Sequence, residues 1–407
     1  MRGPQFEMDA YGREFEMRAW YFTEMPYPHL PPIEQLDSIR VSLPSRHFDP
    51  RIGADLYNRY LDEYIIAADE GLDLMVNEHH QTATCIDVTA PLSLAILARQ
   101  TKTARLCILG NPIANRGDPI RIAEEMAMID CISRGRVDAG FVRGVPYEVF
   151  AANTNPTETL ERLWEGVDLC VKAWTAHDGP WNFEGRFTQR RAVNVWPRPF
   201  QQPHPPVWVT GSSDVSSVRR AAASGYVFAT FLQPHPQVSK LFAAYREAYR
   251  DNGQPGGGGL AFMPLMYVGE TETEAEAGAR ELAWYLAAKV EPQFRNPPGY
   301  VPVEFNVGAM RGDATKVARS ESVRGLKMED ARELGTMMYG TPDQVVAQIE
   351  RQHERIGGFD HLLMMMQAGF LDHKRTVRNI ELFAREVYPR VKHLPGSMAR
   401  PMPQAAE

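Results

Sequence analysis

The feature of this sequence that most constrains its fold is a regular alternation of short apolar runs with longer amphipathic runs. Residues 18–23 (RAWYFT) form the first apolar run, and residues 54–71 follow with apolar side chains at helical spacing. The same order then recurs along the chain. Because strands that alternate with helices pair in parallel through right-handed crossovers, the pattern predicts an α/β protein built on a parallel sheet.

The predicted elements make about eight strand-then-helix units. The predicted strands are residues 18–23, 72–76, 104–110, 136–142, 206–210, 226–230, 260–268 and 361–366. The predicted helices are residues 54–71, 89–101, 118–133, 157–175, 213–224, 236–252, 272–289, 342–356 and 372–388, and residues 181–196 are expected to form a hairpin. Such units close into a TIM (β/α)8 barrel, with an open doubly wound sheet as the competing architecture. No G-x-G-x-x-G opens a helix after an early strand, which disfavours a dinucleotide-binding open sheet.

A chain of 407 residues fits a single barrel domain, which we place at residues 18–390. A polar extension, residues 1–17, precedes this domain, and residues 391–407 form a tail. Residues 291–336 interrupt the alternation, and insertions of this length are usually functional or disordered. In a barrel, the insertion is expected to cover the C-terminal mouth, where barrel enzymes bind their ligands.

The charge and hydropathy of the chain argue against several classes of protein. The formal net charge is -7 and no long basic block occurs, so a nucleic-acid partner is not expected. No apolar run is long enough to span a bilayer, and the N-terminus lacks the apolar stretch of a signal peptide. We therefore expect a cytoplasmic protein with no membrane or nucleic-acid partner.

The cysteines do not indicate a disulfide framework. Cys85, Cys107, Cys131 and Cys170 form no C-x-x-C pair, and most of them lie in apolar surroundings. Buried, reduced thiols are therefore expected rather than disulfides or a zinc site.

Asn77-Glu78-His79-His80 follows the second predicted strand, on the face where barrels bind ligands. A metal site is one interpretation, since imidazoles and carboxylates are metal ligands. However, adjacent histidines point in different directions and no third ligand lies at helical spacing, so no metal is expected. His80 is interpreted as a loop histidine that makes hydrogen bonds, while His79 is expected to exchange protons near neutral pH.

Two features on neighbouring strands suit a phosphate group. Arg143 follows the fourth strand and precedes Gly144; a guanidinium offers a planar fork, and glycine allows close approach of the backbone. From spacing alone, a surface arginine is an equally good interpretation. After the fifth strand, TGSSDVSS (residues 210–217) includes Gly211 and precedes a helix, whose N–H groups together with the serine hydroxyls can bind an anion. Plain N-capping by Ser212 or Ser213 is the alternative.

Four sequence strings carry a family resemblance. They are EHH (78–80), DPIRIAEEMAMIDCISRGRVDAGFVRG (118–144), WPRPFQQPHPPVWVTGSS (196–213), and GTPDQVV (340–346) with ELFAREVYP (381–389). In this order and spacing they resemble the luciferase-like, flavin-dependent monooxygenases, over nearly the whole chain from residue 18 to residue 389. The resemblance supports the TIM barrel and implies an oxidoreductase.

The resemblance also implies how a cofactor binds. Arg143 looks like the arginine that grips the FMN phosphate, and Ser213 and Ser216 resemble further phosphate-binding positions, with Ser212 beside them. Gly110-Asn111, at the end of the third strand, falls where the family backbone passes the flavin ring, often through a non-proline cis peptide.

For catalysis, His79 looks like the active-site histidine of the luciferase α chain. Glu24, at the end of the first strand, points into the same region, and Tyr147 and Glu148 are expected to shape the substrate pocket. Residues 291–336 have no counterpart that can be aligned in luciferase, so bioluminescence and a long-chain aldehyde substrate are not implied.

The implied reaction uses reduced FMN and molecular oxygen to oxygenate a small organic substrate. A separate NAD(P)H-dependent flavin reductase and a homodimer are implied as well. The alternatives are a deazaflavin-dependent hydride-transfer enzyme on the same barrel and a flavin-binding protein without turnover. Five apolar or aromatic residues indicate either a substrate pocket or ordinary core: Met263, Met266, Tyr267, Tyr300 and Phe305.

Overall fold

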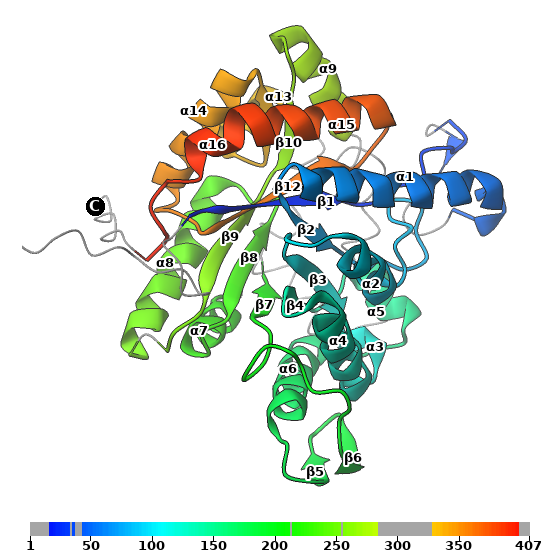
Figure 1. The fold of residues 1–407 in the computed structure, drawn as a ribbon, viewed down its shortest axis with the longest axis vertical. Helices are drawn as coiled ribbons and strands as arrows, with labels where there is room; N and C mark the ends of the chain where they lie inside the picture. Colours follow the sequence, from blue (N-terminus) through cyan, green and yellow to red (C-terminus); the bar gives the residue numbers. More distant parts are fainter. Residues whose placement is uncertain are drawn as a thin grey trace, which may run out of the picture.

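Eight strands pair in parallel, each with the next, and close into a barrel (Figure 1). In order around the barrel they are β1 (Arg18–Thr23), β2 (Asp73–Val76), β3 (Leu106–Pro112), β4 (Val137–Val142), β7 (Val207–Thr210), β8 (Val227–Phe231), β9 (Gly259–Met263) and β12 (His361–Gln367). β1 pairs with β2 on one edge and with β12 on the other, which closes the ring. The computed structural model describes residues 16–32, 35–36, 43–211, 214–253, 255–283 and 328–398. The predicted TIM barrel is confirmed.

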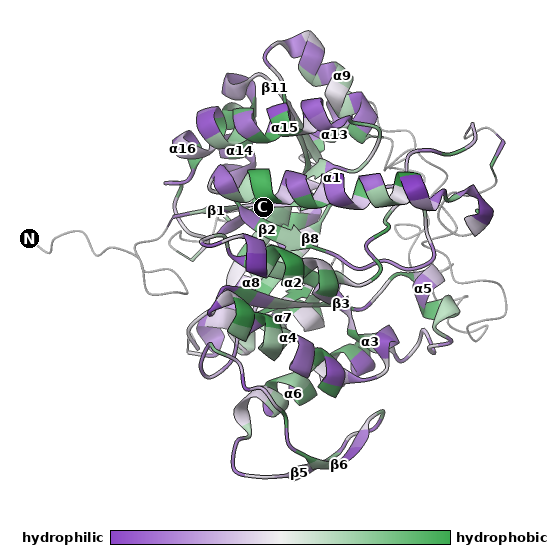
Figure 2. Cartoon of the chain, turned by 45° about the vertical axis from the view of Figure 1, so that its right-hand side comes forward, coloured by the Kyte–Doolittle hydropathy of each residue, from purple (hydrophilic) through white to green (hydrophobic). Residues whose placement is uncertain are grey.

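Helices surround the barrel and turn their polar faces outward. They are α1 (Pro50–Asp69), α2 (Ala90–Gln100), α4 (Pro119–Ser133), α6 (Thr159–Thr175), α7 (Val215–Ala223), α8 (His235–Asp251), α9 (Glu272–Leu282), α14 (Pro342–Arg355) and α15 (His373–Leu382). α15 continues through a π-helical turn, η4 (Phe383–Val387), into α16 (Tyr388–Val391). Figure 2 shows helices such as α9 and α15 as largely hydrophilic toward solvent. None of the helices in the described part of the chain is long and apolar enough to cross a bilayer.

Capping residues and prolines set where these helices begin. α1 begins at Pro50 rather than at the predicted residue 54, because the Asp49 side chain accepts a hydrogen bond from the Arg51 N–H. α4 begins as predicted, with Asp118 as N-cap and Pro119 at the first helical position.

The barrel interior is filled with side chains and is closed at its N-terminal end. The indole of Trp20 donates to His361 Nδ1 at 3.2 Å and lies edge-on to Trp208, with ring centroids 5.2 Å apart. Below these rings, the Arg18 side chain donates to Asp73 at 2.6 Å and the Arg105 side chain to Asp138 at 2.7 Å. Ligands therefore have room only at the opposite, C-terminal end.

The seventh barrel strand differs from its prediction. The predicted strand 260–268 is broken at Pro264 into β9 and β10 (Leu265–Val268). β10 stays beside β12 and pairs on its other edge with β11 (Met337–Gly340), which the sequence did not predict. β11 was missed because its four residues are all apolar and show no alternation.

Several shorter elements complete the chain. β5 (Trp181–Glu184) and β6 (Gln189–Val193) form the predicted hairpin, which projects from the barrel beside α6 (Figure 1). α3 (Ile113–Arg116), α5 (Pro146–Ala151) and α13 (Met328–Leu334) were not predicted. Of the predicted insertion, residues 291–327 lie outside the described residues, and α13 belongs to its last part.

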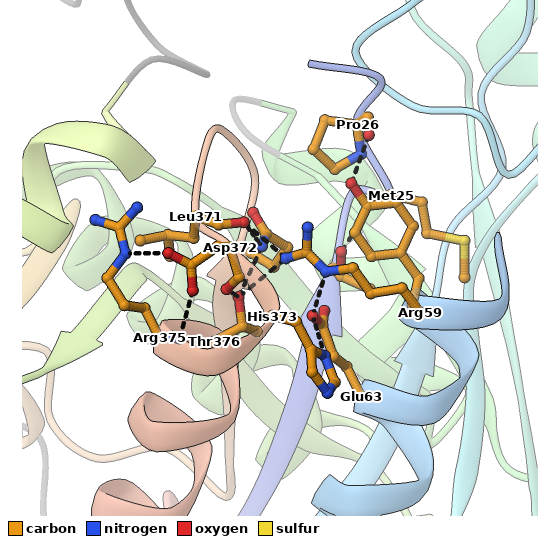
Figure 3. A network of polar contacts seen from close by, with 12 residues as sticks. Met25, Pro26, Arg59, Glu63, Leu371, Asp372, His373, Arg375 and Thr376 are labelled. Carbon is orange, nitrogen blue, oxygen red and sulfur yellow. Dashed lines mark hydrogen bonds and ion pairs between the residues drawn. The ribbon is translucent and has the colours of Figure 1, made fainter. Parts of the chain in front are cut away.

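A buried ionic network joins the first helix to the last barrel unit (Figure 3). Glu63 of α1 is fully buried and accepts hydrogen bonds from Arg59 Nε at 2.7 Å and from His373 Nδ1 at 3.1 Å. Arg59 also donates to the Leu371 carbonyl at 2.6 Å. Burial raises the pKa of Glu63, although Arg59 and His373 lower it in part. The network therefore holds the two ends of the barrel sequence together where they meet.

Replacing Arg59 should destabilise the protein strongly. Arg59→Met leaves the Glu63 carboxylate buried without its cation, and breaking a buried pair in this way costs about 3–5 kcal/mol. The measurement is urea unfolding at pH 8, where Glu63 is ionised in the unfolded chain. The matched control is Arg59→Met combined with Glu63→Gln, which removes the charge and should recover part of the loss. A double variant that is no more stable than the single variant would contradict this account.

Candidate active site

The structure brings together polar side chains that follow the first two strands. Glu24 follows β1 and is fully buried; its Oε2 accepts a hydrogen bond from Asn77 Nδ2 at 3.0 Å. His79, two residues further along the loop after β2, has its Nε2 3.9 Å from the same Glu24 oxygen. Glu24 Oε1 has no hydrogen-bond partner within the described chain. Glu24 and His79, the two predicted catalytic residues, therefore lie side by side.

Glu148 completes this cluster in a way that the sequence did not predict. It lies on α5, after β4, and its Oε1 is 2.8 Å from His79 Nδ1. The same oxygen accepts the backbone N–H of His80 at 3.0 Å and the Tyr147 hydroxyl at 3.2 Å. Burial alone would raise the pKa of Glu148, but His79 and His80 outweigh burial and the pKa is lowered. Glu148 is thus an ionised partner of His79, and Tyr147 reaches the cluster through it.

His80 belongs to a separate pair. Its Nε2 lies 3.1 Å from Glu78 Oε1, and this hydrogen bond raises the pKa of His80 despite its partial burial. Glu78 also accepts the backbone N–H of Ala90 at the start of α2, and Arg116 lies 3.8 Å from it. His80 therefore makes the loop hydrogen bond that was expected of it. Within the described residues, no cluster of three or more histidine, cysteine or acidic side chains is arranged to hold a metal ion.

A further acidic residue, Asp87, contacts the backbone of His79. Asp87 is buried, its backbone carbonyl accepts the His79 N–H at 3.2 Å, and its carboxyl accepts the Ser93 hydroxyl at 3.0 Å. Burial raises the pKa of Asp87 to about 7. Cys85, beside it, is also buried, and burial raises the pKa of its thiol well above the usual value. The thiol is thus protonated and unreactive, as the sequence indicated.

The end of β3 brings the backbone close to β4. A non-proline cis peptide joins Leu109 to Gly110, so the bond expected near Gly110 and Asn111 precedes the glycine. A Cβ on Gly110 would lie 2.6 Å from Val142 Cγ1, so the strands approach too closely here for a side chain. The Asn111 side chain donates to the Gly140 carbonyl at 3.0 Å and accepts from Arg116 at 3.1 Å. Asn111 is fully buried, and its side chain is occupied within the protein.

Arg143 lies near Asp214, the residue that precedes α7. Desolvation by the surrounding protein lowers the pKa of its guanidinium, and the nearby Asp214 carboxylate raises it in part. The side chain nevertheless stays exposed to solvent. Arg143 is thus a solvent-accessible cation close to Asp214.

Asn115, whose amide lies beside Gly144, is a polar residue that sequence reasoning missed. Both of its side-chain amide atoms are buried and have no hydrogen-bond partner within the described part of the chain. Gly144 has a φ of 87°, and a Cβ placed on it would lie 2.5 Å from Asn115 Nδ2. The signal that could have found Asn115 is its place soon after the third strand, in a polar segment without periodicity.

The N-terminus of α7 is arranged differently from the prediction. Asp214 is the N-cap, and its carboxylate accepts the backbone N–H groups of Ser216 and Ser217, both at 3.1 Å. The Ser216 hydroxyl lies 2.8 Å from the same carboxylate. The Gly211 N–H donates to the Ala229 carbonyl at 3.1 Å.

These contacts change the predicted anion site. Capping by Ser212 or Ser213 was wrong, because Asp214 is the N-cap and its carboxylate already accepts the first-turn N–H groups of Ser216 and Ser217. The donors of Gly211 and Ser216 are occupied within the protein. Ser212 and Ser213 themselves lie outside the described residues. Among the residues that are described, Arg143 is the candidate that offers charge to a phosphate.

The apolar residues considered for a pocket are core where the structure describes them. Met263, Met266 and Tyr267 are almost fully buried, and Tyr267 packs against Gly278 of α9, outside the barrel. Tyr300 and Phe305 lie outside the described residues.

A comparison with known proteins places this barrel and its mouth in a family. The profile of the luciferase-like monooxygenases matches residues 45–358. The chain belongs to the luciferase-like monooxygenase family. Its relatives are named enzymes, and this luciferase-like protein is an enzyme as well.

Two relatives and one solved structure illustrate the range of the family. The oxygenase component of the flavin-dependent trigonelline monooxygenase of Acinetobacter baylyi is 30% identical over 296 residues, 66% of this chain and 80% of that protein. The FMNH2-dependent dimethylsulfone monooxygenase of Pseudomonas putida is 25% identical over 308 residues, 74% of this chain and 78% of that protein. The structure of an F420-dependent secondary alcohol dehydrogenase with an F420-acetone adduct shares the fold, with a TM-score of 0.66 at 18% identity, over 93% of this chain and 99% of that chain.

The residues at the mouth suit a flavin. At Gly110 and Gly144 the backbone packs closely against Val142 and against the Asn115 amide, so neither position accommodates a side chain. Asn115 offers a buried donor and acceptor that no described residue uses, and a buried amide without partners costs about 1–3 kcal/mol unless a ligand satisfies it. Arg143, which precedes Gly144 in the chain, adds a cation.

Filling the space at Gly144 should weaken flavin binding. In Gly144→Ala, the new methyl group displaces the Asn115 amide, and a shift of roughly 1.4 kcal/mol would lower the affinity for FMN about tenfold. Fluorescence titration measures this. The matched control is Gly117→Ala, which has a similar φ of 74° but no atom within 4 Å of the new methyl group. If both variants lose the same affinity, backbone strain and not Asn115 is responsible.

Proposed function

We propose that this luciferase-like enzyme is a monooxygenase that uses reduced FMN and molecular oxygen to oxygenate a small organic substrate. The observation that carries the proposal is the cluster of Glu24, His79 and Glu148, on the same mouth as Arg143. The names of the two relatives, a flavin-dependent and an FMNH2-dependent monooxygenase, support the same reaction. The reaction balances when one oxygen atom enters the substrate, the other leaves as water, and reduced FMN supplies two electrons.

The protein residues take the following parts in this proposal. Arg143 binds the phosphate, and the backbone at Gly110 lies against the ring. His79 would accept a proton at Nε2 and return it during the reaction, and the buried Glu24 carboxyl lies 3.9 Å from that nitrogen. The bound flavin supplies the redox chemistry, while the protein orients it and excludes water.

The proposal includes two protein partners. The relative from Acinetobacter baylyi is named an oxygenase component, which favours a separate NAD(P)H-dependent reductase for this enzyme too. A homodimer is supported by α2 and α4, which pack side by side and expose Leu92, Met128 and Ile132 to 62%, 58% and 39%. α2 is largely hydrophobic in Figure 2. Sedimentation velocity of the purified protein distinguishes a dimer from a monomer.

A deazaflavin-dependent hydride transfer is the second candidate. The solved structure with an F420-acetone adduct shares this barrel, so the fold suits either cofactor. The two reactions differ in oxygen: a monooxygenase consumes it with product formation, whereas hydride transfer proceeds without it.

The decisive assay follows oxygen consumption and product with reduced FMN and a panel of small organic substrates, beginning with trigonelline. We expect oxygen consumption that depends on substrate. Substrate reduction by reduced F420 under nitrogen, with no oxygen use under air, would overturn the proposal.

His79→Ala should lower turnover by about 10²-fold or more, the usual size of the effect when general acid–base catalysis is lost, with unchanged FMN affinity. Full activity of His79→Ala would assign that residue to structure.

Arg143 should discriminate FMN from flavins without a terminal phosphate. A charge-assisted hydrogen bond contributes about 1.5–3 kcal/mol, so Arg143→Ala should weaken FMN binding about ten- to a hundredfold. Riboflavin affinity should barely change. Arg143→Lys should recover part of the loss, since lysine keeps the charge but loses the planar fork. Titrations of the three proteins with FMN, FAD and riboflavin test this; wild type should prefer FMN to FAD, and an equal loss for FMN and riboflavin would remove Arg143 from the phosphate site.

A further inference from the structure

The two adjacent histidines at the mouth each have their own buried carboxylate, but they use opposite ring nitrogens. His79 contacts Glu148 through Nδ1 at 2.8 Å, whereas His80 contacts Glu78 through Nε2 at 3.1 Å. We infer that Glu148 is a positioning residue that fixes the proton of neutral His79 on Nδ1 and so makes Nε2 the nitrogen that works in the reaction. This inference rests on the proposed role of His79 in proton transfer.

The direction of the hydrogen bond follows from the chemistry of the carboxylate. An ionised carboxylate can only accept, so the ring nitrogen that faces it must carry hydrogen. Glu148 is 3% exposed, and its contacts with His79 and His80 favour the ionised form. In a neutral imidazole only one nitrogen carries hydrogen, so Nε2 is then the acceptor.

Two further hydrogen bonds fix the position of Glu148 Oε1. Oε1 accepts the His80 N–H at 3.0 Å and the Tyr147 hydroxyl at 3.2 Å, in addition to His79. Because the His80 N–H belongs to the same loop as His79, the carboxylate and the imidazole are held to one backbone segment. A second group that orients a catalytic histidine in this way selects both its tautomer and its ring plane.

The other end of the ring faces the mouth. His79 Nε2 lies 3.9 Å from Glu24 Oε2, which already accepts from Asn77. That distance exceeds a hydrogen bond, so Glu24 is not a direct hydrogen-bond partner of Nε2. The His79 side chain keeps 16% of its surface exposed, whereas Glu24 and Glu148 are buried. The charged groups that face His79 are therefore Glu148, Glu24, His80 and Asp87.

The test reads the tautomer directly. Long-range ¹H–¹⁵N NMR of the whole protein, labelled at histidine, distinguishes Nδ1–H from Nε2–H without substrate or flavin; His79→Ala assigns the signal. We expect Nδ1–H for neutral His79 in wild type. Glu148→Leu, which keeps the volume and removes the acceptor, should shift His79 toward Nε2–H. Glu78→Gln, the matched control at His80, should leave the His79 tautomer as in wild type.

Steady-state kinetics distinguish a positioning role of Glu148 from a purely structural one. Glu148→Leu should lower kcat about tenfold or more with little change in KM or FMN affinity, and Glu148→Asp should restore part of kcat. Wild-type His79 in the Nε2–H form, or the same tautomer with and without Glu148, would overturn the inference even if the enzyme is an oxygenase. The Nδ1–H form in a protein that shows no oxygen-dependent turnover would support the tautomer assignment and refute the proposed function instead. If Glu148→Leu does not fold, the wild-type spectrum alone still tests whether neutral His79 carries its hydrogen on Nδ1.

Discussion

The pairing of β1 with β12 is the contact on which the rest of this structure depends. Until these strands pair, the sheet has two open edges, and the residues that follow β1 and β2 have no fixed relation to the end of the chain. Closure continues beyond the strands, because the Glu24 N–H donates to the Gln367 carbonyl at 3.0 Å. The Glu63 network then joins α1 to the segment after β12. Both contacts lie at the mouth, so the forces that close the barrel also set the position of the Glu24 carboxylate.

The mouth contains more buried acid than a protein interior usually tolerates. Glu24, Glu78, Asp87 and Glu148 are each no more than 3% exposed. A buried ionised carboxylate persists only when charges or hydrogen bonds compensate for its lost hydration. His79, His80 and Arg116 compensate for Glu148 and Glu78, while burial moves the pKa of Asp87 to about 7. The cluster therefore keeps some groups ionised and one close to titration at neutral pH, an arrangement typical of sites that move protons.

The sequence predicted the barrel well because periodicity reports which side chains are buried. Long helices such as α6 bury one face, and their spacing is visible in the chain. The same signal fails for α5 and β11, which are too short to show a period. Arg143 and His79 were found because they follow strands, and strand ends meet at one face of a barrel. The Glu148–His79 contact could not be found in this way, since it depends on the path of a short unpredicted helix. Nor could the cap by Asp214, because three neighbouring residues offer equally suitable side chains and only the backbone decides among them.

The break at Pro264 has a consequence for how this barrel can hold a long insertion. The segment that leaves after α9 returns through α13 to β11, and β11 pairs with β10, the strand that leads into α9. The elements that flank residues 284–327 are thus joined to each other by one parallel ladder, in which β10 also pairs with the barrel strand β12. The entropic cost of closing a loop between two fixed ends grows only with the logarithm of the loop length, by about 0.6 kcal/mol for each doubling. Insertions of different length and composition can therefore be attached at this point without a change in the register of the barrel strands. The cluster of Glu24, His79 and Glu148 would then keep its geometry.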